Sequence, residues 1–355
     1  MIRKMASIQT IHNIRPITGA DRIEMADVLG YHVVIGKDQF KDGDKIIYIE
    51  CDSLLPKDNQ IFSQFEKYNY RVKIQKLRGQ YSMGLCMPLD ILPKTLSKTD
   101  IVIGTDVSEA LNIVKYEPLD SLHVGGLASG QFPSFIPKTD EIRIQNIPQV
   151  LERWKETRFI ACEKLDGSSV TIYLRPNPEI PTLFEFGVCS RNIELIEDPS
   201  SAAWRIVRDE NYEEKLIDLL QCHLNMFQDG IAIQGELIGN GINGNNYQFK
   251  AGEYSIYIFN VFSIKYNRYI SYDIAYNLCR HYGFFTVPYV GEIILNHTVD
   301  DLIELSKGES YFSNSKHQIK REGLVFRSLI ETQDPDIGRL SFKAINPDYL
   351  IKLKD

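Results

Sequence analysis

The sequence has 355 residues and a formal net charge of −7 at pH 7, with 43% hydrophobic and 25% charged residues. The length is typical of two domains, and the composition excludes a disordered, collagen-like or coiled-coil chain. The apolar stretches are shorter than the roughly 20 residues of a membrane-spanning helix, and no apolar leader follows the first residues. Six widely spaced cysteines without a CxxC motif fit free thiols. We therefore expect an intracellular protein of the cytoplasm, nucleus or nucleoid that is neither secreted nor bound to a membrane.

The first 116 residues combine short strand signals with turns. Apolar, β-branched runs alternate with turn sequences such as Lys41–Asp44. Several short strands within about 110 residues indicate a small antiparallel barrel, so we expect residues 1–116 to form one domain. The predicted strands are Tyr31–Ile35, Lys45–Glu50, Arg71–Leu77 and Gly84–Met87.

The segment Lys67–Tyr81 is strongly basic. It carries five cations and no acid, and three tyrosines are interleaved with them. Cations neutralise phosphates and aromatic rings stack on bases, so the segment fits a nucleic-acid contact. It equally fits an edge strand that lysines protect from pairing with other chains. The candidate nucleic-acid-binding residues are Arg71, Lys73, Lys76 and Arg78.

Residues 117–138 contain a cluster of Pro, Gly and Ser that indicates a connector between two domains. From residue 139 to residue 355, strand patterns mix with helical ones, which predicts an α+β domain. Thr298 and Asp301 have the spacing of a capping box for a helix over Val299–Ser306. Further helices are expected over Pro148–Thr157 and Ser200–Leu224. The expected strands are Phe159–Cys162, Val170–Leu174, Phe184–Cys189, Ile231–Ile238, Ser255–Ile264, Gly323–Ser328 and Leu340–Ala344.

The segment 163–169, with the sequence EKLDGSS, ends an apolar strand. An Asp-Gly pair by itself is typical of a surface β-turn. Here, however, four further polar segments follow in order, each at or beside a predicted strand end, and carboxylates on apolar strands are costly to bury unless they have partners. Their main residues are Arg191 with Asn192, then Glu236, then Glu322, and finally Lys343.

This ordered set resembles the nucleotidyltransferase motifs of the covalent lysyl-AMP enzymes, which are the polynucleotide ligases and the mRNA capping enzymes. That resemblance covers roughly residues 139–355. The sequences at 36–56, 76–85 and 132–146 are similar to one family of ATP-dependent RNA ligases, in which an OB domain precedes the nucleotidyltransferase domain. The resemblance implies an α+β chain with an N-terminal OB-like β-barrel over 1–116, a connector over 117–138, and a nucleotidyltransferase domain of antiparallel sheets flanked by helices over 139–355.

The function implied by this resemblance is ATP-dependent ligation of RNA. Lys164 would take AMP from ATP and pass it to a 5′-phosphate, which a 3′-hydroxyl then attacks, at nicks in duplexes with RNA on the 3′-hydroxyl side. The implied cofactors are ATP and Mg²⁺ or Mn²⁺, the partner is nicked RNA, and we expect a monomer. The implied catalytic residues are Lys164, Asp166, Glu236, Glu322 and Lys343. The implied nucleotide-binding residues are Glu163, Lys164, Arg143, Arg191, Asn192, Glu236, Phe259 and Lys343.

Such chemistry explains the residue types. Deprotonating an ordinary lysine at pH 7 costs about 4.6 kcal/mol, and a divalent cation or the neighbouring Lys343 would lower that cost. Asp166, Glu236 and Glu322 are the candidates to hold the metal, through its water ligands, because Mg²⁺ keeps several waters. Glu236 alternatively accepts the ribose hydroxyls. Phe259 lies on an apolar strand and fits either the core or stacking on adenine.

The motif V region around Ser341 and the glycine-rich stretch at 239–244 each differ from the pattern that they resemble. Motif V in many ligases has two lysines flanking one residue, whereas here Ser341 takes the first place; Lys352 and Lys354 are nearby candidates for the missing contact. Residues 239–244 match GxGxxG, but a poor helix start follows, which argues against dinucleotide binding.

The alternative functions are a DNA ligase, a capping-type nucleotidyltransferase, or an OB-fold nucleic-acid-binding protein with an inactive transferase domain. About 12 residues follow Lys343, fewer than the C-terminal OB domain of capping enzymes needs. The intact Lys164, Glu236, Glu322 and Lys343 argue against the non-enzyme.

Overall fold

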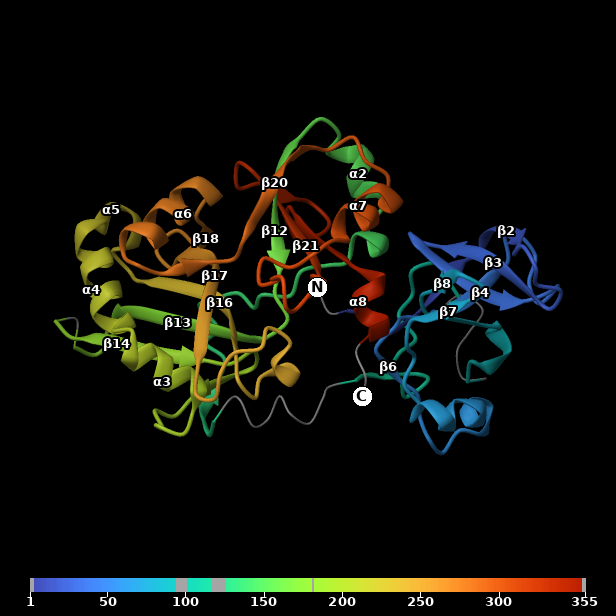
Figure 1. The fold of residues 1–355 in the computed structure, drawn as a ribbon, viewed down its shortest axis with the longest axis horizontal. Coiled ribbons are helices and arrows are strands. Elements are labelled where there is room, and N and C mark those ends of the chain that lie inside the picture. The colour runs from blue at the N-terminus through green and yellow to red at the C-terminus, as the bar shows by residue number, and fades with distance from the viewer. Residues whose placement is uncertain (1–2, 94–100, 117–125, 181, 353–355) are drawn as a thin grey trace.

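The computed structural model describes residues 3–93, 101–116, 126–180 and 182–352 of the chain. It has an N-terminal domain of short strands and a larger C-terminal domain with flanking helices, which lie side by side in Figure 1. The α+β class expected from the sequence is confirmed. Among the described residues, no helix is long and apolar enough to cross a membrane.

The N-terminal domain is built on β5, which pairs with β1 on one side and β9 on the other. A second sheet has the order β2-β3-β4, and alternate residues of β4 are buried, as the period of two in its sequence predicts. Two clusters of buried apolar side chains form the core of this domain. Its elements are β1 (Ala6–Thr10), β2 (His12–Pro16), β3 (Ile23–Val28), β4 (Tyr31–Gly36), β5 (Lys45–Ile49), β6 (Ser53–Leu54), the 3₁₀ helix η1 (Gln60–Tyr68), β7 (Gln75–Leu77), β8 (Gln80–Ser82), β9 (Leu85–Met87), η2 (Leu89–Ile91) and β10 (Val114–Lys115).

The strand predicted over Arg71–Leu77 is wrong for its first four residues. Only Gln75–Leu77 form a strand, β7, which makes a hairpin with β8. Asn69 and Tyr70 have positive φ angles of 51° and 59°, which turn the chain immediately before this segment. The backbone of Arg71 pairs with that of Leu54 in an isolated β-bridge, which does not extend into a strand. Of the apolar residues before β7, Val72 is buried and Ile74 is half-buried, so this alternation did not require a strand.

The C-terminal domain contains two sheets. The large sheet has the order β11-β15-β14-β13-β16-β17-β18, with β19 also paired to β17, and the small sheet has the order β20-β12-β21-β24. One apolar core lies between the large sheet and α3, α4 and α6, and another lies between the small sheet and α2 and α7. The strands are β11 (Ala128–Gln131), β12 (Arg158–Lys164), β13 (Ser168–Pro176), β14 (Phe184–Cys189), β15 (Ile193–Leu195), β16 (Ile231–Gly239), β17 (Tyr254–Ser263), β18 (Arg268–Tyr269), β19 (Phe285–Thr286), β20 (Tyr289–Ile294), β21 (Gly323–Ser328), β22 (Gln333–Asp334), β23 (Gly338–Arg339) and β24 (Ser341–Ile345). The helices are η4 (Ile144–Asn146), α2 (Gln149–Arg153), α3 (Ala202–Asp209), α4 (Tyr212–Cys222), α5 (Leu224–Phe227), η5 (Asn243–Asn245), α6 (Tyr272–His281), α7 (Val299–Ser306) and α8 (Pro347–Lys352).

Several local predictions can be compared directly with these elements. The capping box is confirmed, since the Thr298 and Asp301 side chains each bond the other residue's backbone N–H at the start of α7. The single helix expected over 200–224 is divided into α3, α4 and α5, because Asn211 has a φ of 54° between the first two. Part of the expected connector contributes a strand to the large sheet, because β11 pairs with β15. The first part of the connector, 117–125, lies outside the described residues.

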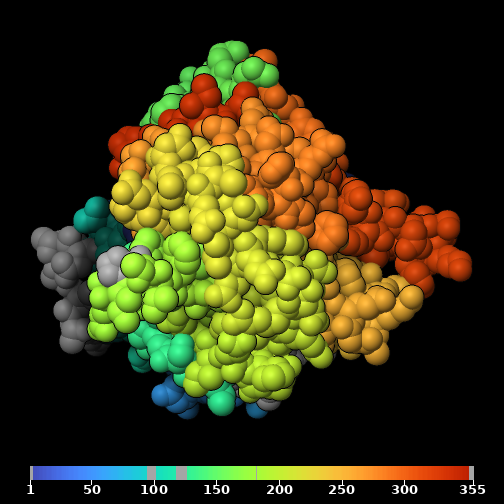
Figure 2. All heavy atoms as spheres, turned by 90° about the vertical axis from the view of Figure 1, so that its left-hand side faces the viewer, coloured from blue at the N-terminus to red at the C-terminus, as the bar shows by residue number. Residues whose placement is uncertain are grey.

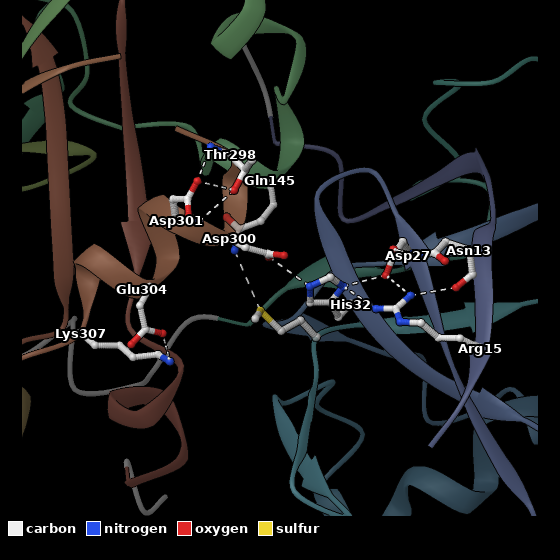
Figure 3. A network of polar contacts seen from close by, with 11 residues as sticks. Asn13, Arg15, Asp27, His32, Gln145, Thr298, Asp300, Asp301, Glu304 and Lys307 are labelled. Atoms are coloured by element: carbon white, nitrogen blue, oxygen red, sulfur yellow. Dashed lines mark hydrogen bonds and ion pairs between the residues drawn. The ribbon is translucent and has the colours of Figure 1, made fainter. Parts of the chain in front are cut away.

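The two domains contact each other through polar groups (Figure 3). His32 on β4 lies between Asp27 on β3 and Asp300 on α7, with its Nδ1 2.7 Å from Asp27 Oδ1 and its Nε2 3.1 Å from Asp300 Oδ1. Nearby, the backbone N–H of Gly30 donates to the carbonyl of Gln145 at 2.8 Å. A Cβ at position 30 would lie only 2.8 Å from the Gln145 Cα, so this close approach of the domains requires glycine.

Candidate active site

A cleft of about 2070 Å³ extends between the N-terminal and C-terminal domains. It gathers residues that are far apart in the sequence, including every predicted catalytic and nucleotide-binding residue. Those lining the cleft are Arg143, Glu163, Lys164, Asp166, Arg191, Asn192, Glu236, Phe259, Glu322 and Lys343. The cleft is therefore the candidate active site.

Lys164 lies where the two sheets of the C-terminal domain meet. It is the last residue of β12 in the small sheet, and β13 of the large sheet begins at Ser168. The turn between them packs closely against β16, because a Cβ on Gly167 would lie 2.3 Å from the carbonyl oxygen of Leu237. The β12–β21 register places Lys164 opposite Gly323, which follows Glu322. The Lys164 Nζ donates to Glu322 Oε2 at 2.6 Å.

Burial and the neighbouring carboxylates shift the pKa of Lys164 in opposite directions. Burial by itself would lower the pKa of the Lys164 ammonium, but Glu322 and then Glu236 outweigh burial and hold this pKa above 10.5. Burial raises the pKa of Glu236 to about 7, although Lys164 opposes the rise. Burial also raises the pKa of Glu322, again against Lys164. Without a ligand, the neighbouring carboxylates therefore favour the ammonium form of Lys164.

The Asp166 carboxylate is held by neutral donors. Asn243 donates to Oδ1 at 3.0 Å, and Asn246 and the Tyr349 hydroxyl donate to Oδ2 at 2.8 and 2.6 Å. The backbone N–H of Asp166 donates to the Tyr247 hydroxyl at 2.7 Å. These partners were not predicted from the sequence, although the GxGxxG-like stretch marked the Gly/Asn-rich loop that supplies the asparagines. In this fold the loop positions a carboxylate.

Lys343 and Arg143 form the cationic side of the cleft. Lys343 is on β24, its backbone N–H donates to the Ile142 carbonyl at 2.8 Å, and Arg143 forms an isolated bridge beside it. Burial, followed by repulsion from Lys164 and Arg143, lowers the pKa of Lys343 to about 7. Arg143 is 8% exposed and pairs with Asp52 of the N-terminal domain at 3.4 Å. Asp52 of the N-terminal domain therefore holds Arg143, which is a predicted phosphate-binding residue.

The structure shows what surrounds Ser341, where a lysine was expected. Ser341 is the direct cross-strand partner of Arg327 on β21, and its hydroxyl donates to the Glu141 carboxylate. Arg327 pairs with the same carboxylate at 3.1 Å, and its guanidinium lies 5.6 Å from the centre of the Phe259 ring. Arg327 lines the cleft and was missed from the sequence. The Lys352 side chain and Lys354 lie outside the described part of the chain.

The other predicted nucleotide contacts lie around the same cleft. Glu163 is buried, accepts the Tyr311 backbone N–H at 2.8 Å, and has a pKa raised by burial. Phe259 lines the cleft and also packs against an apolar cluster of buried side chains. Arg191 donates through Nη2 to both carboxylate oxygens of Asp140, at 2.5 and 2.6 Å, and Asn192 accepts from Lys138 at 3.0 Å.

The predicted nucleic-acid-binding residues separate into two places. Arg71 lines the cleft, pairs with Asp52 at 2.8 Å, and lies 4.0 Å from the centre of the Tyr116 ring. Lys73 follows it and is half-buried. Lys76 and Arg78 are exposed on the β7–β8 hairpin outside the cleft.

Among the described residues, no three His, Cys, Asp or Glu side chains are arranged to bind a metal directly. The prediction that Asp166, Glu236 and Glu322 hold a metal through its waters therefore stays a prediction. The donor set nevertheless suits Mg²⁺ or Mn²⁺, because oxygen ligands of carboxylates are those that these ions prefer. Glu322, Glu236 and Asp166 all raise the pKa of the Lys164 ammonium, so this corner of the cleft attracts cations.

Comparisons with known proteins agree with this geometry. A family model described as RNA ligase matches residues 157–345, and an OB-fold domain model matches residues 5–89. A search of curated proteins found no match. Solved structures of an RNA ligase from Naegleria gruberi are similar over nearly the whole length. A mutant without ligand has 35% identity and a TM-score of 0.85, covering 99% of this chain and 98% of that one. A mutant with ATP and Mn has 35% identity and a TM-score of 0.85, covering 99% of both chains. A mutant with AMP and Mn has 36% identity and a TM-score of 0.85, covering 99% of this chain and 100% of that one.

The fold and the cleft define a nucleotidyltransferase domain preceded by an OB-fold domain. The chain belongs to the RNA ligase family, and it is an RNA ligase enzyme.

Proposed function

We propose that this RNA ligase uses ATP with Mg²⁺ or Mn²⁺ to seal 3′-hydroxyl and 5′-phosphate ends at nicks in duplexes that carry RNA on the 3′-hydroxyl side. The observation that carries the proposal is the placement of Lys164 in the cleft, 2.6 Å from Glu322. The similar Naegleria gruberi ligase has been solved with ATP and Mn, with AMP and Mn, and with PPi. We further expect an intracellular monomer.

The residues of the cleft fit both ATP and a metal. Lys343, Arg143 and Arg191 would contact phosphates, because cations with fixed N–H donors match phosphate oxygens. Glu163 and Phe259 would contact adenine. Asp166, Glu236 and Glu322 would hold the metal's waters. When bound, the metal would neutralise charge that builds up on the α-phosphate.

The first reaction takes place at the Nζ of Lys164. The Glu322 carboxylate is the acceptor within hydrogen-bond reach of the Lys164 proton, and its raised pKa makes it a better base. The free amine then attacks the α-phosphorus, the bond to the bridging oxygen breaks, and pyrophosphate leaves. Lys343 would stabilise the negative charge on the α-phosphate, and Arg143 or Arg191 the charge on pyrophosphate or the substrate phosphate.

Two transfers complete ligation. An oxygen of the 5′-phosphate attacks the phosphorus of the lysyl-AMP, and Lys164 leaves and recovers a proton. The 3′-hydroxyl oxygen then attacks the activated 5′-phosphorus, and AMP leaves. The OB-fold domain, with Arg71, Lys73, Lys76 and Arg78, would grip the duplex during these steps.

The proposal is tested with labelled ATP or GTP and a divalent cation, followed by denaturing electrophoresis. Label should comigrate with the protein only from ATP. Nicked duplexes with RNA or DNA on the 3′-hydroxyl side then test the strand preference, and only the former should be sealed efficiently. Glu322→Ala and Lys343→Ala should each lose at least about 10²-fold in sealing, the effect of removing one electrostatic contact. Equal sealing of both duplexes would remove the proposed strand preference.

A further inference from the structure

The segment between α7 and β21, residues 307–321, forms a loop that projects from the C-terminal domain, at the right of Figure 2. Its base is firmly anchored. Arg321 donates through Nε to the Ser306 carbonyl at 3.0 Å and through Nη2 to the Leu305 carbonyl at 2.6 Å, which caps the end of α7. The Ser310 N–H donates to the Ile319 carbonyl at 2.8 Å, so the two arms of the loop hold each other.

The 307–321 loop is connected to the residues around the nucleophile. The Tyr311 backbone N–H donates to the carboxylate of Glu163, the neighbour of Lys164, at 2.8 Å. The Phe312 ring lies 4.8 Å from the Tyr247 ring, and the Tyr247 hydroxyl accepts the backbone N–H of Asp166. The inner side of the loop thus packs against Glu163, which lines the cleft, and against Tyr247, which bonds the turn at Asp166.

The outer side of the loop presents an aromatic ring and a lysine to solvent. Tyr311 is 72% exposed, more than any other large hydrophobic side chain of the described residues except Ile330. Lys316 and His317 are exposed at the tip of the loop. An exposed ring and an exposed cation in one loop suit the binding of unpaired or splayed nucleotides, because a ring stacks on a base and a cation contacts a phosphate.

The 307–321 loop also meets the basic hairpin of the N-terminal domain. Lys320 pairs with Asp348 on α8 at 3.0 Å, and the Tyr81 hydroxyl of β8 donates to the same carboxylate. Lys76 and Arg78 are exposed on this hairpin. The carboxylate of Asp348 therefore joins two segments that are far apart in the sequence, and each of them carries exposed cations, Lys316 on the loop and Lys76 with Arg78 on the hairpin. Exposed cations attract a phosphate backbone.

We propose that the 307–321 loop is an RNA-strand contact of the ligase, in which Tyr311 stacks on a base next to the break and Lys316 contacts a backbone phosphate. The proposal rests on the proposed RNA-joining function and adds to it a specific loop, which Asp348 links to the β7–β8 hairpin. It assigns the loop to RNA binding and not to the formation of lysyl-AMP.

The test compares Tyr311→Ala, Lys316→Ala and the double variant with wild type. Binding is measured to a nicked RNA duplex with a 5′-hydroxyl at the nick, which cannot be sealed, at several salt concentrations. The double variant should bind at least about fivefold more weakly, the lower end of base–aromatic stacking, and its slope of log affinity against log salt should fall by about 0.7–0.9 for the lost phosphate contact. Lys265→Ala with Tyr266→Ala, in the β17–β18 turn, is the matched control, because Tyr266 is also exposed beside a lysine. It should leave affinity and slope unchanged.

Further readouts separate an RNA contact from a structural role. Tyr311→Phe should restore affinity, whereas Tyr311→Leu should not, since only an aromatic ring stacks. The rate of lysyl-AMP formation should stay within about twofold of wild type in every variant, because the Glu163 contact comes from the backbone of Tyr311. Unchanged affinity and salt slope in the double variant would overturn the proposal, including the case in which the loop binds another protein. Failure of wild type to form lysyl-AMP would instead refute the proposed function.

Discussion

Replacing Asp52 by Asn tests whether the OB-fold domain holds an arginine of the phosphate site. Asp52 bonds Arg71 at 2.8 Å and Arg143 at 3.4 Å, and the Arg143 side chain is 9% exposed. Asp52 has a φ of 69°, in the left-handed region that Asn also tolerates, so the substitution removes the charge without adding backbone strain. Removing one partner from a fully buried ion pair costs about 3–5 kcal/mol. Because the Asp52 side chain is 28% exposed and an amide can still accept a hydrogen bond, we expect about 2–3 kcal/mol.

The assay for this prediction combines unfolding with enzyme kinetics. The free energy of unfolding is measured in urea, and the rate of lysyl-AMP formation is measured with labelled ATP. We expect about a tenfold lower rate, equivalent to about 1.4 kcal/mol, because Arg143 loses the group that orients it. Asp38→Asn is the matched control, since Asp38 also has a positive φ, of 58°, but is exposed. If Asp52→Asn and Asp38→Asn lose equally little stability and activity, the reasoning is refuted.

The pH dependence gives an independent check of the same pair. Burial opposes the effect, but Arg143 and Arg71 hold the pKa of Asp52 below its ordinary 3.8. A carboxyl whose pKa is lower in the folded state contributes stability above its unfolded pKa and loses it as the pH falls through the folded value. The difference in unfolding free energy between wild type and Asp52→Asn should therefore be constant from pH 6 to 8 and shrink below about pH 3.8.

Three further predictions follow from single residues. Lys164→Arg should form no lysyl-AMP although it retains the charge that pairs with Glu322, because a guanidinium is not deprotonated in proteins; a stable protein–AMP adduct in that variant would contradict the mechanism. The pKa of Lys343 is about 7, and the phosphates of ATP favour its ammonium form, so ATP binding at pH 8 should take up a proton. Calorimetry in buffers of different ionisation enthalpy measures this uptake, which should disappear in Lys343→Arg. Equal uptake in both proteins would exclude Lys343 as the source of the effect. Gly30→Ala should destabilise the domain contact by about 1–3 kcal/mol because its Cβ would meet Gln145, and thermal unfolding with no change would show that the domains can separate there freely.

A shorter fragment tests the division of labour between the domains. A chain beginning near Pro137 keeps every predicted nucleotide contact, which predicts that it still forms lysyl-AMP and fails mainly in sealing. The structure adds a reason for a partial loss, since Arg143 would lose Asp52 and Asn146 would lose Glu50, to which it donates at 2.8 Å. We expect slower lysyl-AMP formation from this fragment, comparable to that of Asp52→Asn. A fragment without any activity would show that the OB-fold domain is needed for the first step.

Local sequence was sufficient for the parts of this protein that depend on neighbours in the chain. The alternation in β4, the capping box of α7 and the strand–turn at 163–169 follow from side-chain period and turn chemistry over a few residues. The ordered motifs also identified the acids and lysines that the structure gathers in one cleft. The same local reasoning predicted too long a strand at Arg71–Leu77. Asn69 and Tyr70 turn the chain just before it with positive φ angles, and the alternation of polar and apolar residues does not reveal such angles.

The sequence by itself therefore indicated the two-domain α+β plan and, through the family resemblance, Lys164, Glu236, Glu322 and Lys343 as residues of the candidate site. The tertiary structure alone decided which groups complete their surroundings: Arg327 opposite Ser341, Asp52 against Arg143, and the asparagine loop around Asp166. The physical reason is that strand register and domain packing bring these partners together across 14 to 91 residues of sequence, from Arg327 to Ser341 and from Asp52 to Arg143. A hydrophobic period records which face of an element is buried, but it carries no information on which distant element covers that face.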